Sequence, residues 1–318
     1  MPLPRVSILV PVYGVERYIA RCARSLFAQK YANIEYIFVD DCTPDNSIGL
    51  LQSILEEFPE RMEQVHIVRQ DRNMGVGAAR RRAIEECTGD YVMHVDSDDC
   101  ITDNAVEKLV SAALETDADI VDGAYQEFSG NSDSHFPVIY PLPLPKEKQL
   151  KRILLQNIVG NNLWARIYKK AIYTSNNINF EEGIDYGEDF SIVPRLMFHA
   201  KRAFIDDVVY LYRNDNAGSY TSRRTPKQDQ STIRANVVVY KFFLANDLQG
   251  VYTKHLNMGM IALYRYARKN NLPQHEIDTA LGTPIKGLAP QLCRMLFGSA
   301  MPYCFSNIVY RMLRRMYL

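Results

Sequence analysis

Residues 91–99 read Tyr91-Val92-Met93-His94-Val95-Asp96-Ser97-Asp98-Asp99, a short apolar run followed at once by three carboxylates. An apolar run of this length is typical of a strand buried in a sheet. In an open α/β sheet, ligands bind just outside the carboxyl ends of the strands. Mg²⁺ prefers oxygen ligands and usually binds one or two carboxylates together with substrate phosphates. The stretch therefore predicts a site where a metal ion meets a diphosphate.

A plainer interpretation of the same stretch is an Asp-rich turn in which Asp99 or Asp103 caps the next helix. Spacing alone does not decide between the two, because Asp-x-Asp occurs often by chance. A second apolar run ends in the same way, namely Ile34-Glu35-Tyr36-Ile37-Phe38-Val39-Asp40-Asp41. Two strands that both end in carboxylates favour a ligand site over a chance turn.

Strands and helices are expected to alternate along the first 125 residues. Residues 6–13, 65–69 and 119–123 have the composition of further strands. In residues 15–29 and 46–58, apolar side chains recur at the three- and four-residue spacing of a helix. This alternation predicts an α/β fold with a mainly parallel sheet and flanking helices.

Bulk composition excludes several other classes of protein. The chain has 318 residues, 47% of them hydrophobic, which suits one large domain with an appendage. A net charge of zero provides no global basic field to attract nucleic acid. Six cysteines without CxxC spacing argue against a zinc site or a disulfide framework and suit a reducing compartment. No run reaches ~18 apolar residues and no signal peptide is expected before the first strand, so a cytoplasmic location is predicted.

Residues 71–82 follow a predicted strand and open a predicted helix. Glycines let the backbone come close to a ligand, the N-terminus of a helix favours anions, and arginine side chains donate hydrogen bonds to phosphate. We predict a nucleotide-linked role for Arg80 and a solvated position for at least one of Arg81 and Arg82. The alternative is a helix start whose arginines are all solvated.

Gly75-x-Gly77 also resembles the start of a dinucleotide-binding fingerprint, with Asp96 about 20 residues further on. Two features oppose that interpretation. The position of the third glycine holds Arg80, and the motif follows the third predicted strand rather than the first.

In this order, the motifs resemble those of family 2 glycosyltransferases, enzymes of the GT-A fold that move a sugar from a nucleotide diphosphate to an acceptor. The resemblance is close over about residues 5–125. It implies a GT-A domain over residues 1–225, with a Rossmann-like nucleotide half at about 1–125 and an acceptor half at about 160–225. A helical region over residues 226–318 follows, outside the resemblance.

The resemblance also implies which residues bind the donor. Pro11 and Tyr13 line a pocket for the base, and Asp40 accepts a hydrogen bond from it. Asp98 ligates Mg²⁺ or Mn²⁺, which bridges the diphosphate of a nucleotide sugar, with a UDP-sugar as the expected donor. A cation there stabilises the charge that develops as the glycosidic bond breaks. The other residues implied to hold the nucleotide are Asp41, Asn73, Gly75, Arg80, Asp96 and Ser97.

An acceptor hydroxyl must lose its proton as it attacks, and carboxylates placed within hydrogen-bond reach are common general bases. Gly187-Glu188-Asp189-Phe190 resembles the family's Glu-Asp motif, which lies at the start of a helix. We predict Asp189 as the base, with Glu188 as the second candidate, and inversion at the anomeric carbon. The alternative is that acids in the first turn simply favour the helix dipole.

Two further elements resemble parts of the acceptor half. Trp164, the only tryptophan of the chain, is predicted to stack on an acceptor sugar, although a lone tryptophan is more often part of a core. Tyr212-Arg213, followed by Ser219-Tyr220-Thr221, resembles a loop that closes over the diphosphate, with a structural turn as the alternative.

Three departures from the family pattern concern the shape of the base and donor pocket. Gly14 stands where Asn is usual, and Arg81 stands where Asn is common. Cys42-Thr43-Pro44-Asp45 replaces Gly-Ser-Thr-Asp. Every residue implied to bind the donor or metal is nevertheless present.

The end of the chain has a distinct charge pattern. After Asp278 there is no Asp or Glu, while apolar residues alternate with Lys286, Arg294, Arg311, Arg314 and Arg315. A basic amphipathic helix is typical of peripheral membrane contact. A helix packed on the main domain, or a homo-oligomer contact, would show the same pattern.

The predicted function is therefore an inverting glycosyltransferase that uses a nucleotide sugar and a glycan or lipid-linked acceptor in polysaccharide biosynthesis. A sugar-phosphate nucleotidyltransferase is one alternative, but it would usually have a Gly-rich basic loop after the first strand, where residues 11–15 read Pro-Val-Tyr-Gly-Val. A non-catalytic sugar-nucleotide binding protein is the other.

Overall fold

The computed structural model describes residues 3–130, 136–155, 161–216 and 225–281, together with 291, 295, 308–312 and 315. The chain divides into two compact units. The first consists of Met1–Pro143, Asn162–Asp185 and His199–Ser222. The second consists of Leu144–Asn161, Tyr186–Phe198 and Arg223–Leu318.

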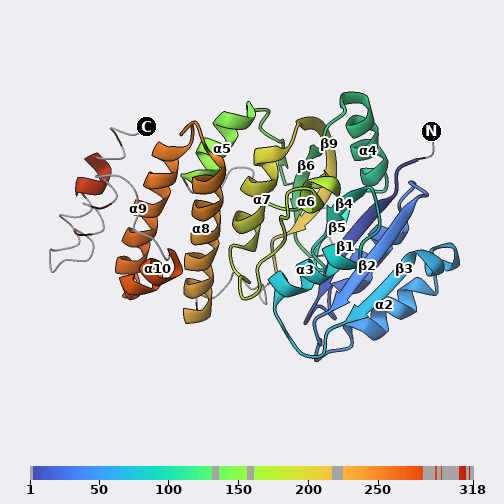
Figure 1. Ribbon diagram of the computed structural model, residues 1–318. Coiled ribbons are helices and arrows are strands. Elements are labelled where there is room, and N and C mark those ends of the chain that lie inside the picture. The colour runs from blue at the N-terminus through green and yellow to red at the C-terminus, as the bar shows by residue number, and fades with distance from the viewer. Residues whose placement is uncertain are drawn as a thin grey trace. The chain divides into compact units, whose positions relative to one another are not determined.

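A single mixed sheet forms the centre of the first unit (Figure 1). Its strands follow the order β3-β2-β1-β4-β8-β6-β9-β5, and β7 pairs with β6. The first four strands are parallel: β1 (Val6–Val12), β2 (Ile34–Asp40), β3 (Val65–Arg69) and β4 (Tyr91–His94). The others are β5 (Cys100–Ile101), β6 (Ile120–Phe128), β7 (Val138–Ile139), β8 (Arg166–Lys169) and β9 (Arg202–Arg213).

The central strands are mostly apolar, because helices and loops cover them. Every residue of β2 and β4 is buried, as expected for parallel strands with both faces covered. β8 runs antiparallel to both β4 and β6, and β6 is parallel to β9. The predicted α/β fold is confirmed, with a parallel nucleotide half and a mixed sheet beyond β4.

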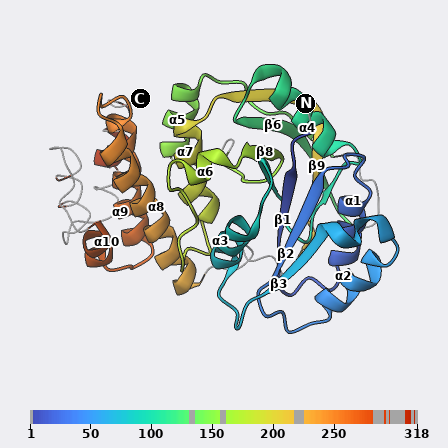
Figure 2. The ribbon, with the colours of Figure 1, turned by 45° about the vertical axis from the view of Figure 1, so that its right-hand side comes forward.

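Helices connect and cover these strands (Figure 2). The apolar side chains of α1, spaced three and four residues apart, are buried against the sheet, as the spacing in residues 15–29 predicted. The helical elements of this unit are α1 (Ile19–Phe27), α2 (Ser47–Leu55), the 3₁₀ helix η1 (Pro59–Gln64), α3 (Val76–Glu86), α4 (Ala105–Thr116) and α6 (Ala171–Thr174).

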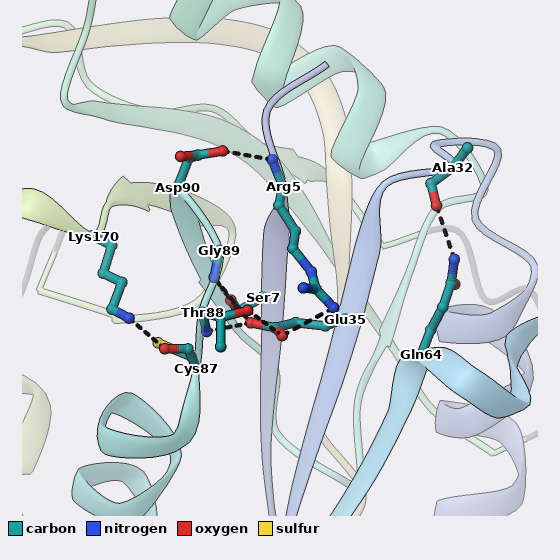
Figure 3. A network of polar contacts seen from close by, with 10 residues as sticks. All are labelled: Arg5, Ser7, Ala32, Glu35, Gln64, Cys87, Thr88, Gly89, Asp90 and Lys170. Atoms are coloured by element: carbon teal, nitrogen blue, oxygen red, sulfur yellow. Dashed lines mark hydrogen bonds and ion pairs between the residues drawn. The ribbon is translucent and has the colours of Figure 1, made fainter. Parts of the chain in front are cut away.

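A buried carboxylate joins the amino ends of β1 and β2 to the segment before β4 (Figure 3). Glu35 accepts hydrogen bonds from the Ser7 hydroxyl, from the hydroxyl and N–H of Thr88, and from the Gly89 N–H. The Arg5 guanidinium lies 3.3 Å from the same carboxylate. We call these five residues the amino-end network. Glycine is needed at position 89 because a Cβ there would lie 2.5 Å from the Ser7 Oγ.

The second unit is helical. It contains α5 (Lys146–Leu154), most of α7 (Glu188–His199), α8 (Pro226–Asn246), α9 (Thr253–Lys269) and α10 (Gln274–Leu281). A capping box between Thr225 and Gln228 starts α8, with Pro226 in its first turn. The predicted helical C-terminal region is thus confirmed for residues 226–281.

The basic tail lies largely outside the described residues. Residues 308–312 are helical, and Arg311 is exposed. Within the described parts of the chain, no helix is both long and apolar enough to span a bilayer. The membrane and oligomer predictions for this tail stay predictions.

Candidate functional site

The carboxyl end of β4 runs into a tight turn that we call the acidic turn, residues Asp96–Asp99. The Asp99 N–H donates to the Asp96 carbonyl oxygen at 3.0 Å and closes this turn. The Val95 N–H donates to the Leu9 carbonyl oxygen at 3.0 Å, which holds β4 against β1 up to the start of the turn. The turn therefore lies at the edge of the sheet where ligands bind in α/β folds.

Asp99 is an anchor rather than a ligand. Its carboxylate accepts hydrogen bonds from the Tyr210 hydroxyl and from the Arg213 N–H, both at 2.7 Å. Burial, followed by the charges of Asp98 and Asp96, raises the pKa of Asp99 well above its ordinary value. The capping interpretation was wrong: the N-cap residue of α4 is Asn104, whose side chain makes no capping hydrogen bond.

Asp96 is paired with the arginine that the sequence singled out. Nη2 of Arg80 lies 2.8 Å from Oδ1 of Asp96, and the Arg80 side chain is only 4% exposed. Arg81 and Arg82 instead pair with glutamates four residues further along α3, on its solvent side. The solvated position predicted for at least one of Arg81 and Arg82 is confirmed for both, whereas the nucleotide-linked role of Arg80 stays a prediction.

Asp98 is the carboxylate that remains for a ligand. Its Oδ2 accepts one hydrogen bond, from the Asn216 side-chain amide at 2.7 Å. Burial, and then the neighbouring Asp96 charge, raise the pKa of Asp98. Negative charge is therefore in excess at this turn, and a bound cation would relieve that excess.

The donor set suits a cation that brings ligands of its own. Among the described residues, no group of three or more His, Cys, Asp or Glu side chains is arranged to hold a metal ion. Asp99 is committed to β9 and Asp96 to Arg80, which leaves Asp98 as the protein ligand. Mg²⁺ bound through one carboxylate, with the remaining positions filled by phosphate oxygens and water, fits this arrangement.

Asp41 shapes the loop before α3. Its carboxylate accepts hydrogen bonds from the N–H groups of Met74 and Gly75, at 2.7 and 2.9 Å, and from the Gln70 side chain at 2.7 Å. Burial raises the pKa of Asp41, and the nearby Asp185 carboxylate raises it further. These hydrogen bonds hold the backbone of Met74 and Gly75 in place in the predicted loop before α3.

Gly75 is required by both its backbone and its surroundings. Its φ of +94° lies in a region that other residues rarely adopt. A Cβ there would also lie 2.1 Å from Oδ1 of Asp185. Sequence reasoning missed Asp185, which is buried and lies 110 positions away in the chain. Asn73, two residues earlier, is exposed.

The predicted base-binding residues lie at the carboxyl ends of β1 and β2. Pro11 is opposite Val39 in the sheet, and Tyr13 follows β1 with 48% of its surface exposed. One oxygen of Asp40 accepts from the Thr43 N–H at 2.8 Å. Ser97, in the acidic turn, is buried.

Hydrogen bonds connect the two segments of this region that depart from the family pattern. The Gly14 N–H donates to the Thr43 hydroxyl at 2.9 Å, and that hydroxyl donates to Asp45 at 2.7 Å. Gly14 has a φ of +67°, which glycine adopts without strain. The two loops that follow β1 and β2 are therefore tied together through residues that differ from the common motif.

Trp164 stacks on tyrosines of β9. Its ring is nearly parallel to those of Tyr210 and Tyr212, with centroid distances of 4.8 and 5.2 Å. Tyr125 meets it edge-on at 4.6 Å. The predicted contact of Trp164 with an acceptor stays a prediction. Sequence reasoning missed Tyr210, although its two-residue spacing from Tyr212 puts both on one face of a strand.

Arg213 reaches the acidic turn from the end of β9. Its guanidinium lies between the rings of Tyr18 and Phe128, 4.8 and 4.5 Å from their centroids. Its Nε donates to the Asp98 carbonyl oxygen at 3.1 Å. The loop predicted to close over the diphosphate, including Ser219-Tyr220-Thr221, lies outside the described residues.

Glu188 and Asp189 belong to the second unit, where they begin α7 as predicted. Gly187 precedes them with a φ of +80°, and the Ser191 N–H donates to its carbonyl oxygen at 2.9 Å. Several apolar side chains of this helix are buried, including Val193 and Leu196. The role of either acid as a base stays a prediction.

Comparison with known proteins agrees with this fold. The model of a family described as glycosyl transferase family 2 matches residues 7–174. A glycosyltransferase of Streptococcus pneumoniae, GlyG, is 28% identical over 221 residues, which cover 65% of this chain and 70% of GlyG.

Solved structures share the fold at low sequence identity. Residues 1–349 of TarS from S. aureus, in complex with UDP, superpose with a TM-score of 0.65 at 18% identity, covering 98% of this chain and 91% of that one. The mannosyltransferase PcManGT from Pyrobaculum calidifontis, in complex with GDP-Man and Mn²⁺, gives 0.51 at 14% identity, covering 99% and 86%.

Proposed function

This chain belongs to glycosyl transferase family 2 and is a glycosyltransferase, and we propose that it moves a sugar from a nucleoside diphosphate to a glycan or lipid-linked acceptor in polysaccharide biosynthesis. One observation carries the proposal. At the carboxyl end of β4, the acidic turn holds an excess of negative charge, and among the described residues the one other side chain that donates a hydrogen bond to the Asp98 carboxylate is that of Asn216. A metal-bound diphosphate is the ligand that such a turn suits.

In the proposed site, Asp98 binds Mg²⁺ or Mn²⁺ and Arg80 holds Asp96 in place beside it. The ion, when bound, would stabilise the negative charge of the departing diphosphate. Asp41 keeps the Gly75 backbone in position at the start of α3, where the N-terminus of the helix favours an anion. Pro11, Tyr13 and Asp40 would bind the base, since they lie at the carboxyl ends of β1 and β2.

A UDP-sugar is the proposed donor. The fold is shared with TarS, which was solved with UDP, and with PcManGT, which was solved with GDP-Man and Mn²⁺. These ligands belong to those proteins and make uridine and guanosine diphosphates the first candidates here. The identity of the base depends on the pair of loops tied together through Gly14 and Thr43.

A thermal-shift screen tests the donor site. UDP and GDP would each be added with Mn²⁺, with Mg²⁺ or with EDTA. A ligand that binds only the folded state raises the melting temperature by mass action. We expect one nucleotide to raise it in the presence of metal and not in EDTA. A folded sample that responds to neither nucleotide would contradict the proposal.

We propose Asp189 as the base that takes the proton from the acceptor hydroxyl, with Glu188 as the alternative. The support is the resemblance of Gly187-Glu188-Asp189-Phe190 to the family motif and its position at the start of α7. Asp189→Asn should retain metal-dependent donor binding and lose transfer by roughly 10²- to 10⁴-fold, the usual contribution of a general base. If Glu188→Gln loses transfer and Asp189→Asn does not, the base is Glu188.

A further inference from the structure

Tyr210 in β9 contacts both ends of the acidic turn through one hydroxyl group. The hydroxyl accepts a hydrogen bond from the Asp96 N–H at 3.0 Å and donates one to Oδ2 of Asp99 at 2.7 Å. Asp98 lies between these two residues in the chain. The Tyr210 hydroxyl therefore restrains the backbone of Asp96 and the side chain of Asp99, one on each side of the residue proposed to bind the cation.

A tyrosine hydroxyl suits this position because it can accept one hydrogen bond and donate another. Burial, and then the Asp99 charge, raise the pKa of Tyr210 well above its ordinary value, so the proton stays on the phenol. Phenylalanine would remove this acceptor from the Asp96 N–H and, among the described residues, would leave the Asp99 carboxylate with the Arg213 N–H as its donor. Both groups lie at the ends of the turn, so its geometry would relax.

The ring of Tyr210 is held as firmly as its hydroxyl. Tyr210 is 0% exposed, and the Trp164 indole lies nearly parallel to it at 4.8 Å. The same strand supplies a second restraint, because Arg213 donates through its N–H to Asp99 and through Nε to the Asp98 carbonyl oxygen. The Arg213 side chain is itself enclosed by the rings of Tyr18 and Phe128.

We propose that Tyr210 is a positioning residue, which holds the Asp98 carboxylate where a metal-bound nucleoside diphosphate can bind. The inference rests on the proposed function, since it assumes that Asp98 is the metal ligand. It also gives Trp164 a role, as the side chain that packs on Tyr210 and keeps its hydroxyl aimed at the turn.

The test compares two tyrosines of the same aromatic stack. Tyr210→Phe removes the hydroxyl bonded to the turn. Tyr125→Phe, in β6, is the matched control, because Tyr125 meets Trp164 edge-on at 4.6 Å and no hydrogen bond among the described residues joins its hydroxyl to the turn. The affinity of each variant for UDP with Mn²⁺, and for GDP with Mn²⁺, would be measured by isothermal titration calorimetry, alongside its melting temperature without ligand.

We expect Tyr210→Phe to weaken metal-dependent nucleotide binding by about 10- to 100-fold, as is usual when a partner of a metal ligand is removed. Tyr125→Phe should bind within about twofold of the wild type, because its loss leaves the hydrogen bonds of the turn intact. A purely structural role would lower the melting temperature of Tyr210→Phe and leave the affinity of its folded fraction unchanged. That result would overturn the proposal.

Failure of the two proposals can be told apart. If the wild type binds neither nucleotide with Mn²⁺, the proposed function fails. If the wild type binds and Tyr210→Phe binds equally well, only the positioning role fails. Should Tyr210→Phe not fold, Trp164→Phe carries the test, because it keeps the Tyr210 hydroxyl but weakens the stack that aims this hydroxyl at the turn. Undiminished affinity in that variant would contradict the inference as well.

The lone tryptophan supplies an independent readout. Because Trp164 stacks on Tyr210, its fluorescence should change when a ligand reorders the acidic turn. The change should occur over the same Mn²⁺-nucleotide concentrations as the calorimetric binding. It should move to higher concentrations in Tyr210→Phe. If the wild type binds the nucleotide and its Trp164 emission does not change, the aromatic stack is not coupled to the acidic turn.

Discussion

The parallel strands of the first unit carry carboxylates at both ends, but the hydrogen bonding and the pKa values of these carboxylates differ between the two ends. At the amino ends, Glu35 accepts hydrogen bonds from Ser7, Thr88 and Gly89 and pairs with Arg5. At the carboxyl end of β4, three aspartates crowd into one turn. The pKa of Glu35 is lowered, whereas the pKa values of Asp98 and Asp99 are raised.

The difference separates stability from ligand binding. A buried carboxylate whose two oxygens both accept hydrogen bonds from the protein stabilises the folded state and is not available to a ligand. A carboxylate that stays under-compensated makes the empty fold less stable, and binding of a cation recovers that energy. Binding of a cation should therefore stabilise the acidic turn, whereas the amino-end network is stabilised without a ligand.

The largest expected effect comes from neutralising the carboxylate proposed to bind the ion. Asp98→Asn keeps the size of the side chain and should lower the transfer rate on the order of 10³-fold, since a metal contributes several kcal/mol of charge stabilisation. Its melting temperature without ligand should equal or exceed that of the wild type, because a partly buried charge has been removed. A variant with nearly full transfer activity would remove Asp98 from the metal site.

The opposite pattern is expected at the amino ends. Glu35→Gln should reduce the free energy of unfolding by about 2 kcal/mol, because hydrogen bonds to a buried charged group are among the stronger ones. Nucleotide binding by the folded protein should stay unchanged. Chemical denaturation would measure the loss, with Glu57→Gln as the control, because that glutamate pairs with Arg24 on the exposed surface. Weakened nucleotide binding in Glu35→Gln would break the comparison between the two ends.

The smallest effect is the pH dependence of that loss. Burial acts to raise the pKa of Glu35, but hydrogen bonds from Ser7 and Thr88 outweigh it and bring the pKa below the ordinary value of 4.5. A lowered folded-state pKa means that this stabilisation is fully present above pH 4.5 and is lost as the pH falls through the folded value. The unfolding energies of wild type and Glu35→Gln should thus converge in acid. A gap that stays constant would show that the ionised form is not what stabilises the fold.

The nucleotide half could be predicted from the sequence because its signals are local. β1, β2 and β4 are mostly apolar runs, as is typical of parallel strands buried on both faces, and the carboxylates at the ends of β2 and β4 are adjacent in the chain. The start of α3 could be predicted for the same reason, since Gly75 and Arg80 lie within one turn and a half of helix.

What could not be predicted depends on contacts between distant segments. Asp99 is 111 residues from Tyr210 in the chain, and without that contact the three aspartates of the turn look equivalent. Local sequence also gave no sign that β8 pairs between β4 and β6, which brings the Trp164 side of the chain beside β9. Asp185 and its approach to Gly75 belong to the same class.

Calorimetric titration of UDP, and of GDP, into wild type, Asp98→Asn and Glu35→Gln, each with Mn²⁺ and with EDTA, tests the central claim most directly. The account predicts that the wild type and Glu35→Gln bind one nucleotide with similar affinity when Mn²⁺ is present and much more weakly in EDTA. It predicts that Asp98→Asn loses the difference between the two conditions. Metal-dependent binding that persists in Asp98→Asn would contradict it.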